Sequence, residues 1–242
     1  MYAWKWWREH RGRAITYLII LSAFAAFIPW LNPAGPPHFA GQGYVPGAVE
    51  TWRIALVVFG SIVLVIAGLG LGASGVGDEF SQGTLGFLLA QPRSRKYFVW
   101  AGWLAGASAV LMIIGLAVLI SLASLAVLTK TALGWKLPTI IVPLFVLGAV
   151  VYGLTFFMTA LTKNGRNGMS YSLGVLAISL PLPWALETEA KVSVPSPFDV
   201  LEASKWATSQ SAHFPFVAII GWGLVALAFP LATQFLFERA EV

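Results

Sequence analysis

Six long stretches without a charged residue divide this chain of 242 residues. They cover residues 14–49, 54–77, 97–129, 137–162, 167–186 and 206–237. A helix needs about 20 apolar residues to cross about 30 Å of hydrocarbon, and helices satisfy their own backbone in lipid. Trimming the polar and proline-rich ends predicts transmembrane helices near 14–31, 54–76, 100–128, 139–161, 168–184 and 214–237. The predicted fold class is an all-α membrane protein, with one transmembrane domain over residues 1–242.

Charge placement supports this fold class. Only 10% of the residues are charged, against about a quarter in soluble domains, and all of them lie outside the six trimmed spans. Ion-coupled transport usually uses charged groups inside the membrane, so these spans argue against it. Cysteine is absent, which excludes disulfide and thiolate chemistry. The apolar run continues past a small-x-small pattern at Ala23–Ala25, so an uncleaved first helix is favoured over a signal peptide.

Lysine and arginine indicate the orientation. The side that holds the N-terminus, the second and fourth loops and the C-terminus carries ten of them, whereas the other side carries five. Because basic residues concentrate in cytoplasmic loops, both termini are predicted to be cytoplasmic. The expected location is the cell (plasma) membrane of a prokaryote. Tryptophans near most span ends form an aromatic belt that supports the same boundaries.

The segments outside the spans differ in kind. Residues 2–13 interleave tryptophan with basic groups, which predicts a short N-terminal helix in the cytoplasmic interface. The first external loop is rich in proline and glycine and is expected to be irregular. Ser196, Pro197 and Asp199 form a helix-start pattern, which predicts a short external helix near 197–208.

Several kinds of site are missing from the sequence. There is no Gly-x-x-x-x-Gly-Lys-Ser/Thr loop to hold phosphates, and no spacing typical of a metal site. Three histidines (His10, His38 and His213) lie near predicted membrane boundaries and are interpreted as solvated or interfacial. We expect no metal, no catalytic residue and no nucleic-acid partner.

One serine raises a catalytic alternative. Gly72-Ala73-Ser74-Gly75 resembles the serine motif of rhomboid intramembrane proteases, which need a histidine within hydrogen-bond reach of the serine. Ser74 is predicted at the cytoplasmic end of the second span and His213 at the external end of the sixth. The favoured interpretation is that Gly68, Gly72 and Gly75 form a small-residue face for helix packing.

The second cytoplasmic loop is the most informative segment. Leu85, Leu88 and Leu89 fall on one face of a predicted helix over residues 83–91, which Pro92 ends. Periodicity alone allows two interpretations, packing against lipid headgroups or docking into a cleft of a soluble partner.

This loop also carries a family pattern. It reads Glu79-x-x-x-Gly83-Thr84-Leu85-x-x-Leu88-Leu89-x-x-Pro92-x-Ser94-Arg95. Between the second and third of six spans, the pattern resembles the signature of type-2 ABC transporter permeases. These also share the basic N-terminal segment and a Ser-Pro-Phe-like element before the last span, as at 196–198. Gly86 and Gly102 depart from the usual family residues, glutamate and lysine, which weakens the subfamily assignment.

The resemblance implies a coupling helix at 83–91 that seats in a separate ATP-binding cassette ATPase, with Glu79 and Arg95 as polar contacts at its ends. ATP and Mg would then bind on the partner and not on this chain. A second permease copy or paralogue would complete the transporter, surrounded by membrane lipid. An uncharged pathway suits export of a hydrophobic or amphipathic substrate. A secondary transporter with broken helices near Pro181 and Pro183 stays an alternative.

Overall fold

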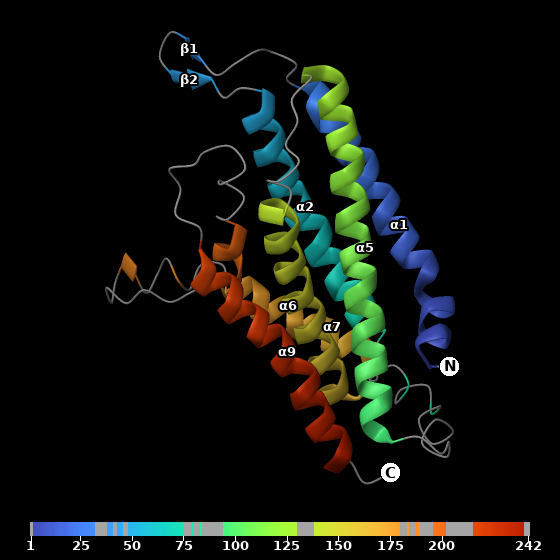
Figure 1. Cartoon of the computed structure of the whole chain (residues 1–242). Helices are drawn as coiled ribbons and strands as arrows, with labels where there is room; N and C mark the ends of the chain where they lie inside the picture. The colour runs from blue at the N-terminus through green and yellow to red at the C-terminus, as the bar shows by residue number, and fades with distance from the viewer. Residues whose placement is uncertain are drawn as a thin grey trace.

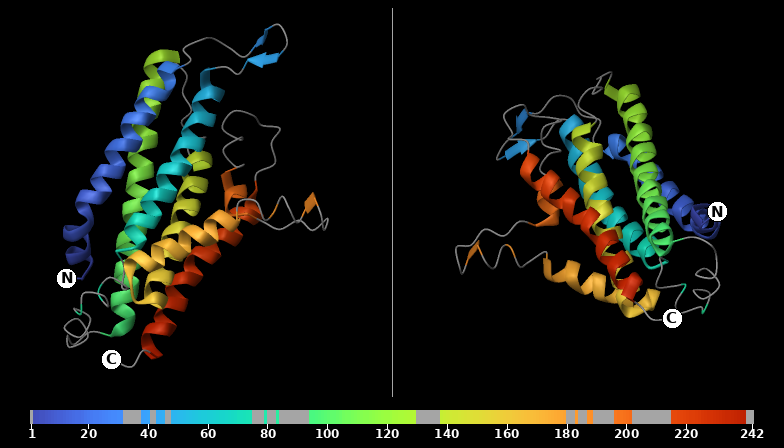
Figure 2. Two further views of the ribbon diagram at one scale, coloured as in Figure 1. Left: turned by 180° about the vertical axis from the view of Figure 1, so that it is seen from behind. Right: turned by 60° about the horizontal axis from the view of Figure 1, so that its bottom comes forward.

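The computed structural model describes residues 2–31, 38–40, 43–45, 48–74, 79, 83, 94–129, 138–179, 183, 187–188, 196–201 and 215–239. Six α-helices of 15 or more residues lie within these ranges. They are α1 (Tyr2–Leu31), α2 (Ala48–Gly72), α5 (Arg95–Thr129), α6 (Pro138–Thr162), α7 (Gly165–Ser179) and α9 (Phe216–Arg239). The five long helices run along the bundle, whereas α7 is strongly inclined to them, and both chain ends lie at the same end of the bundle (Figures 1 and 2).

Five of these helices are long and apolar enough to cross a membrane, namely α1, α2, α5, α6 and α9. This confirms a helical protein with several membrane-spanning segments. Helix α7 corresponds to the predicted span 168–184 but has 15 residues, a length of about 22 Å. Residues 180–182 lie outside the described part of the chain, so a sixth span stays a prediction.

The N-terminal segment differs from its prediction. Instead of a separate interfacial helix over residues 2–13, the structure has one continuous helix of 30 residues, α1. Residues 2–13 contain no proline, and their single glycine, Gly12, has open space around it. Nothing in this segment therefore forces a break between an interfacial helix and the span that follows. Helix α1 is about 45 Å long, enough to reach beyond the hydrocarbon core.

The first predicted external loop is not wholly irregular. Residues His38–Ala40 (β1) and Gly43–Val45 (β2) pair antiparallel, with Phe39 opposite Tyr44. Aromatic and β-branched residues favour extended pairing. This hairpin lies at the end of the molecule opposite the termini (Figures 1 and 2).

Helix α6 is the centre of the bundle. It packs against α2, α5, α7 and α9. Of the residues in the most apolar 18-residue stretch of each helix, 78% are buried in α6, compared with 22% in α1 and 17% in α9. Helices α1 and α5 lie side by side along much of their length (Figure 2). The outer faces of α1, α7 and α9 carry exposed apolar side chains such as Ile20, Leu173 and Val217, as expected where lipid or another subunit covers them.

Only part of the predicted external helix near 197–208 is described. Residues 197–201 form a short 3₁₀ turn. The Ser196 backbone N–H donates to Asp199 Oδ2 at 2.6 Å, and the Phe198 N–H donates to Ser196 Oγ at 3.3 Å. These reciprocal bonds form the capping arrangement that the sequence predicted. Residues 202–208 lie outside the described part.

Candidate functional site at the end of the bundle that holds both termini

The loop between α2 and α5 is described at few positions. The structure describes Glu79, Gly83, Ser94 and Arg95 of this loop. The other residues of the predicted coupling segment lie outside the described residues, namely Thr84, Leu85, Leu88, Leu89 and Pro92. Gly83 is exposed and has a φ of 69°, a left-handed conformation that glycine adopts without steric cost. A turn at Gly83 therefore precedes the predicted helix.

Glu79 is held by the N-terminal part of α1. Its carboxylate Oε1 lies 2.7 Å from Nζ of Lys5, and the residue is only 8% exposed. The same lysine lies 3.9 Å from Oε1 of Glu9, one turn along α1. A short ion pair with little exposure is stronger than one in water because the local dielectric is lower. The predicted partner-facing residue Glu79 is thus engaged within the chain.

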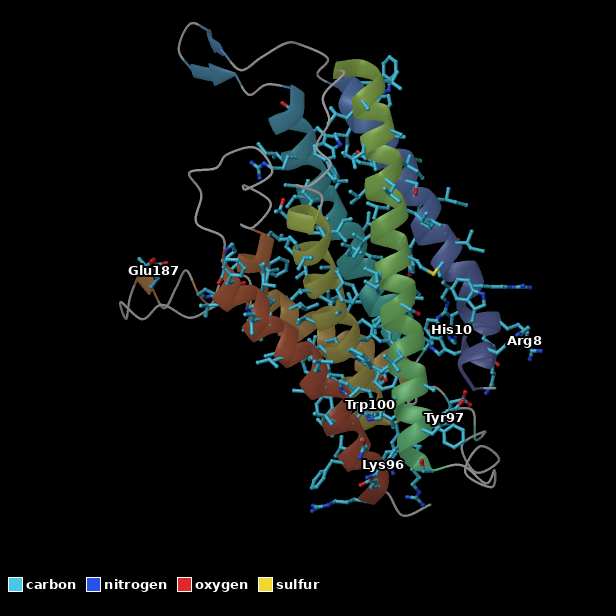
Figure 3. All side chains as sticks on the ribbon, in the orientation of Figure 1. Arg8, His10, Lys96, Tyr97, Trp100 and Glu187 are labelled. Carbon is cyan, nitrogen blue, oxygen red and sulfur yellow. The ribbon has the colours of Figure 1, made fainter. Side chains whose placement is uncertain are left out.

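Arg95, at the other end of the loop, is held by the C-terminal part of α9. Its Nη1 donates to the carbonyl oxygen of Phe237 at 3.1 Å. Further along α5, Trp100 Nε1 donates to Gln234 Oε1 at 2.9 Å, and Lys96 lies 3.7 Å from Glu238. Figure 3 shows Lys96, Tyr97 and Trp100 at the end of α5 beside the end of α9. The loop is therefore bracketed by contacts to the first and the last helix.

Ser74 shows no catalytic pairing. Its hydroxyl donates to the Gly70 carbonyl at 3.1 Å and accepts a hydrogen bond from the Arg13 guanidinium. His10 lies on α1, stacked on Trp6 with Nδ1 2.6 Å from the Trp6 carbonyl oxygen. Among the described residues, no histidine is hydrogen-bonded to Ser74, so the geometry gives the protease alternative no support. His38 lies in β1, and His213 lies outside the described part.

Small residues let α2 approach α6 closely. A Cβ built on Gly68 would lie 2.9 Å from Cγ1 of Val151, and one on Gly72 would lie 2.6 Å from Cβ of Thr155. Real Cβ atoms essentially never come this close. Gly75, the third glycine of the predicted packing face, lies outside the described residues.

A second glycine contact, which was not predicted from the sequence, lies on α5. The buried Tyr152 ring of α6 covers Gly106, where a Cβ would lie 2.1 Å from Cζ, and its hydroxyl donates to the Gly102 carbonyl at 2.9 Å. Gly102 and Gly106 form a Gly-x-x-x-Gly pattern, a known signal for close helix packing, so this contact had a detectable signature. In the family that the sequence resembles, a lysine is common at the position of Gly102. In this chain Gly102 has a packing role, because its carbonyl accepts the hydrogen bond from Tyr152.

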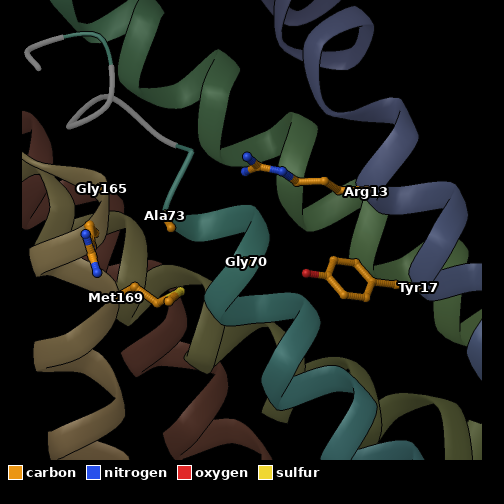
Figure 4. A pocket seen from close by; sticks show the side chains of 7 residues that line it. Arg13, Tyr17, Gly70, Ala73, Gly165 and Met169 are labelled. Carbon is orange, nitrogen blue, oxygen red and sulfur yellow. The ribbon is translucent and has the colours of Figure 1, made fainter. Parts of the chain in front are cut away.

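An open cavity of about 310 Å³ lies between α1, α2 and α7. Arg13 and Tyr17 reach it from α1, and Figure 4 shows both side chains pointing toward α2. Arg166 and Met169 of α7 line the opposite side. In the described part of the chain, no group of three or more acidic or histidine side chains could hold a metal ion.

Five long apolar helices, joined at their ends by polar contacts, define a multi-pass integral membrane protein. The profile of a family described as ABC-2 family transporter protein matches residues 8–242, and the chain belongs to this family. A comparison with curated proteins found no match. The chain is thus a membrane transport subunit of a kind that is generally non-catalytic, and permeases of this family normally pair with an ATP-binding cassette ATPase.

Proposed function

We propose that this chain is the permease of an ATP-driven exporter and that the loop at 79–95 couples it to a separate ATPase subunit. The supporting observation is that this loop is tied at both ends to the ends of the bundle, at Glu79 to α1 and at Arg95 to α9. A displacement of the loop would therefore be passed to two outer helices at once.

This arrangement changes the roles proposed for the two polar residues. Glu79 is 8% exposed and paired with Lys5, so we assign it to anchoring the loop within the permease. Arg95 has the same task toward α9. Contact with the ATPase then falls to the segment between Gly83 and Pro92. Leu85, Leu88 and Leu89 form the apolar face of its predicted helix, and Thr84 lies at the start of that helix.

The transporter would contain two permeases, as two copies or two paralogues, and an ATPase that binds ATP and Mg. ATP-driven closure of the ATPase subunits would push the loops and change the packing between helices. The six predicted spans carry no charged residue, so a pathway along the interface between the permeases would be uncharged, which suits a hydrophobic or amphipathic substrate. The loops between α2 and α5 and between α6 and α7 would face the cytoplasm, with both termini.

Changing Leu85 and Leu88 together to Asp tests the coupling. Burial of each leucine in a partner cleft would contribute about 1.5–3 kcal/mol, and carboxylates in that cleft would oppose binding through their desolvation. We expect the ATPase to be lost on co-purification of the permease, while membrane insertion survives because the spans are unchanged.

Ala90→Asp is the matched control, compared with Leu88→Asp alone. It adds the same charge to the predicted helix on the side opposite the leucine face, and should retain the ATPase. If Leu85→Asp/Leu88→Asp binds the ATPase as tightly as the unaltered protein, the loop is not the docking element, although family membership would stand.

A further inference from the structure

The cavity between α1, α2 and α7 is strongly basic. Arg13 comes from α1 and Arg166 from the first turn of α7, which has no acidic residue. Within the described residues, no carboxylate forms an ion pair with either guanidinium. Arg13 gives one hydrogen bond to Ser74, and because a guanidinium has five N–H donors, most of its donors stay available.

The cavity lies at the depth of lipid headgroups. Arg13 is the last charged residue before the charge-free run 14–49, and Arg166 the last before 167–186. Both guanidinium groups therefore stand at the boundary between water and the apolar part of the bundle. Tyr17, one turn further along α1, adds a hydroxyl at the position where aromatic residues anchor membrane helices.

An exposed apolar surface continues from the cavity along both helices. On α7, Arg166, Met169 and Leu173 share one helix face, because residues three and four apart are neighbours, and Leu173 is 54% exposed. On α1, Arg13, Tyr17 and Ile20 share a face in the same way, with Ile20 half exposed. A ligand that fits both parts has an anionic head and a hydrocarbon tail.

We propose that this cavity binds the phosphate of an anionic glycerophospholipid. Two guanidinium groups from different helices recognise phosphate oxygens with paired, charge-assisted hydrogen bonds. The cavity has room for a headgroup, and the acyl chains lie against Ile20 and Leu173. Basic pockets between membrane helices on the cytoplasmic side are suited to such headgroups. The bound lipid links α1 to α7, and the site does not depend on the proposed ATPase coupling.

Native mass spectrometry of the purified permease tests the site, with phosphatidylglycerol titrated in and phosphatidylcholine as the comparison lipid. We expect tight binding of phosphatidylglycerol and weak binding of phosphatidylcholine. Arg13→Gln/Arg166→Gln should weaken the apparent affinity for phosphatidylglycerol by roughly tenfold or more, because hydrogen bonds to charged groups are lost. Arg8→Gln/Arg11→Gln removes the same charge from exposed positions outside the cavity and should leave the affinity nearly unchanged.

Any one of the following results would overturn the proposal. Equal affinity of the Arg13→Gln/Arg166→Gln variant and the unaltered protein for phosphatidylglycerol would mean that the cavity is not the lipid site. A change in oligomer mass without a change in lipid binding would mean that the cavity contacts a second copy of the chain. Displacement of phosphatidylglycerol by an equal concentration of inorganic phosphate would assign the cavity to a free anion. If the glutamine variant folds poorly, Arg13→Lys/Arg166→Lys replaces it and keeps the charge. This variant should still lose affinity for phosphatidylglycerol, because lysine cannot bind phosphate in a bidentate manner. Unchanged affinity of the lysine variant would contradict the site.

Discussion

Individual glycines decide how closely the central helix can be approached. Gly68 and Gly72 on α2 and Gly106 on α5 each lie where a methyl group would overlap a side chain of α6. In lipid, helices associate through van der Waals contact and not through exclusion of water. Close approach therefore contributes directly to stability between these helices, and at these three positions it requires that no Cβ atom be present.

Gly72→Ala should lower the free energy of unfolding by about 1–3 kcal/mol through overpacking. Its Cβ would meet Thr155 Cβ at 2.6 Å and the backbone oxygen of Tyr152 at 2.9 Å, and the backbone cannot move aside as a flexible side chain can. Gly115→Ala, on α5, is the control, because a Cβ there has nothing within 4 Å and alanine favours the helix. Unfolding in mixed micelles measures both, and equal stability of the two variants would contradict the packing role.

At the level of elements, the first helix does more than cross the membrane. Its N-terminal turns, predicted as a separate interfacial helix, extend the span as a single rod and carry Lys5 to Glu79. Arg13 of the same helix reaches Ser74 at the end of α2. Helix α1 is thus attached at two points to the segment that leads into the predicted coupling helix.

The pair Lys5 and Glu79 should show a measurable interaction. Lys5→Glu and Glu79→Lys should each destabilise the protein, since like charges would then meet, whereas the combined swap should recover part of the loss. We expect an interaction energy of about 1 kcal/mol from a double-mutant cycle, because the Glu79 side chain is only 11% exposed.

The swap of Lys96 and Glu238 is the matched comparison for this cycle. Those side chains are 63% and 39% exposed, and water screens such pairs, so little coupling should be found. An interaction at Lys5 and Glu79 no larger than this one would mean that the loop is not anchored through α1.

At the level of the whole molecule, both chain ends, the end of α2, the start of α5 and the turn between α6 and α7 lie at one end (Figure 1). The segment 75–94 and the turn at Lys163 and Asn164 follow helices that end there (Figure 1). The hairpin β1–β2 lies at the other end. The distribution of lysine and arginine predicts that the end with both termini faces the cytoplasm. Cysteine labelling can test this orientation, because the chain has no cysteine of its own.

Single cysteines at Ser81 and Asn164 should resist an impermeant thiol reagent in intact cells, and a cysteine at Gln42 should react. Permeabilised cells provide the control, since all three positions should then be labelled. Labelling of the Ser81 variant from outside would reverse the orientation and with it the proposed contact between the loop and an ATPase.

The sequence alone determined the membrane class and the position of five long helices. These follow from the length and charge of each segment, and a segment of sufficient apolar length is helical in lipid whatever its neighbours are. The helix start at Ser196 was likewise predictable because its hydrogen bonds join residues three apart.

Tertiary structure decided which helix lies at the centre and which residues meet. Lipid is as apolar as the protein interior, so the buried and the exposed faces of these helices carry the same kinds of residue, and no periodicity marks α6 as central. The contacts of Lys5 with Glu79 and of Arg95 with Phe237 join residues 74 and 142 positions apart. Such pairs, and the cavity that brings Arg13 beside α7, arise only when the helices pack, because no local property of the chain selects the partners.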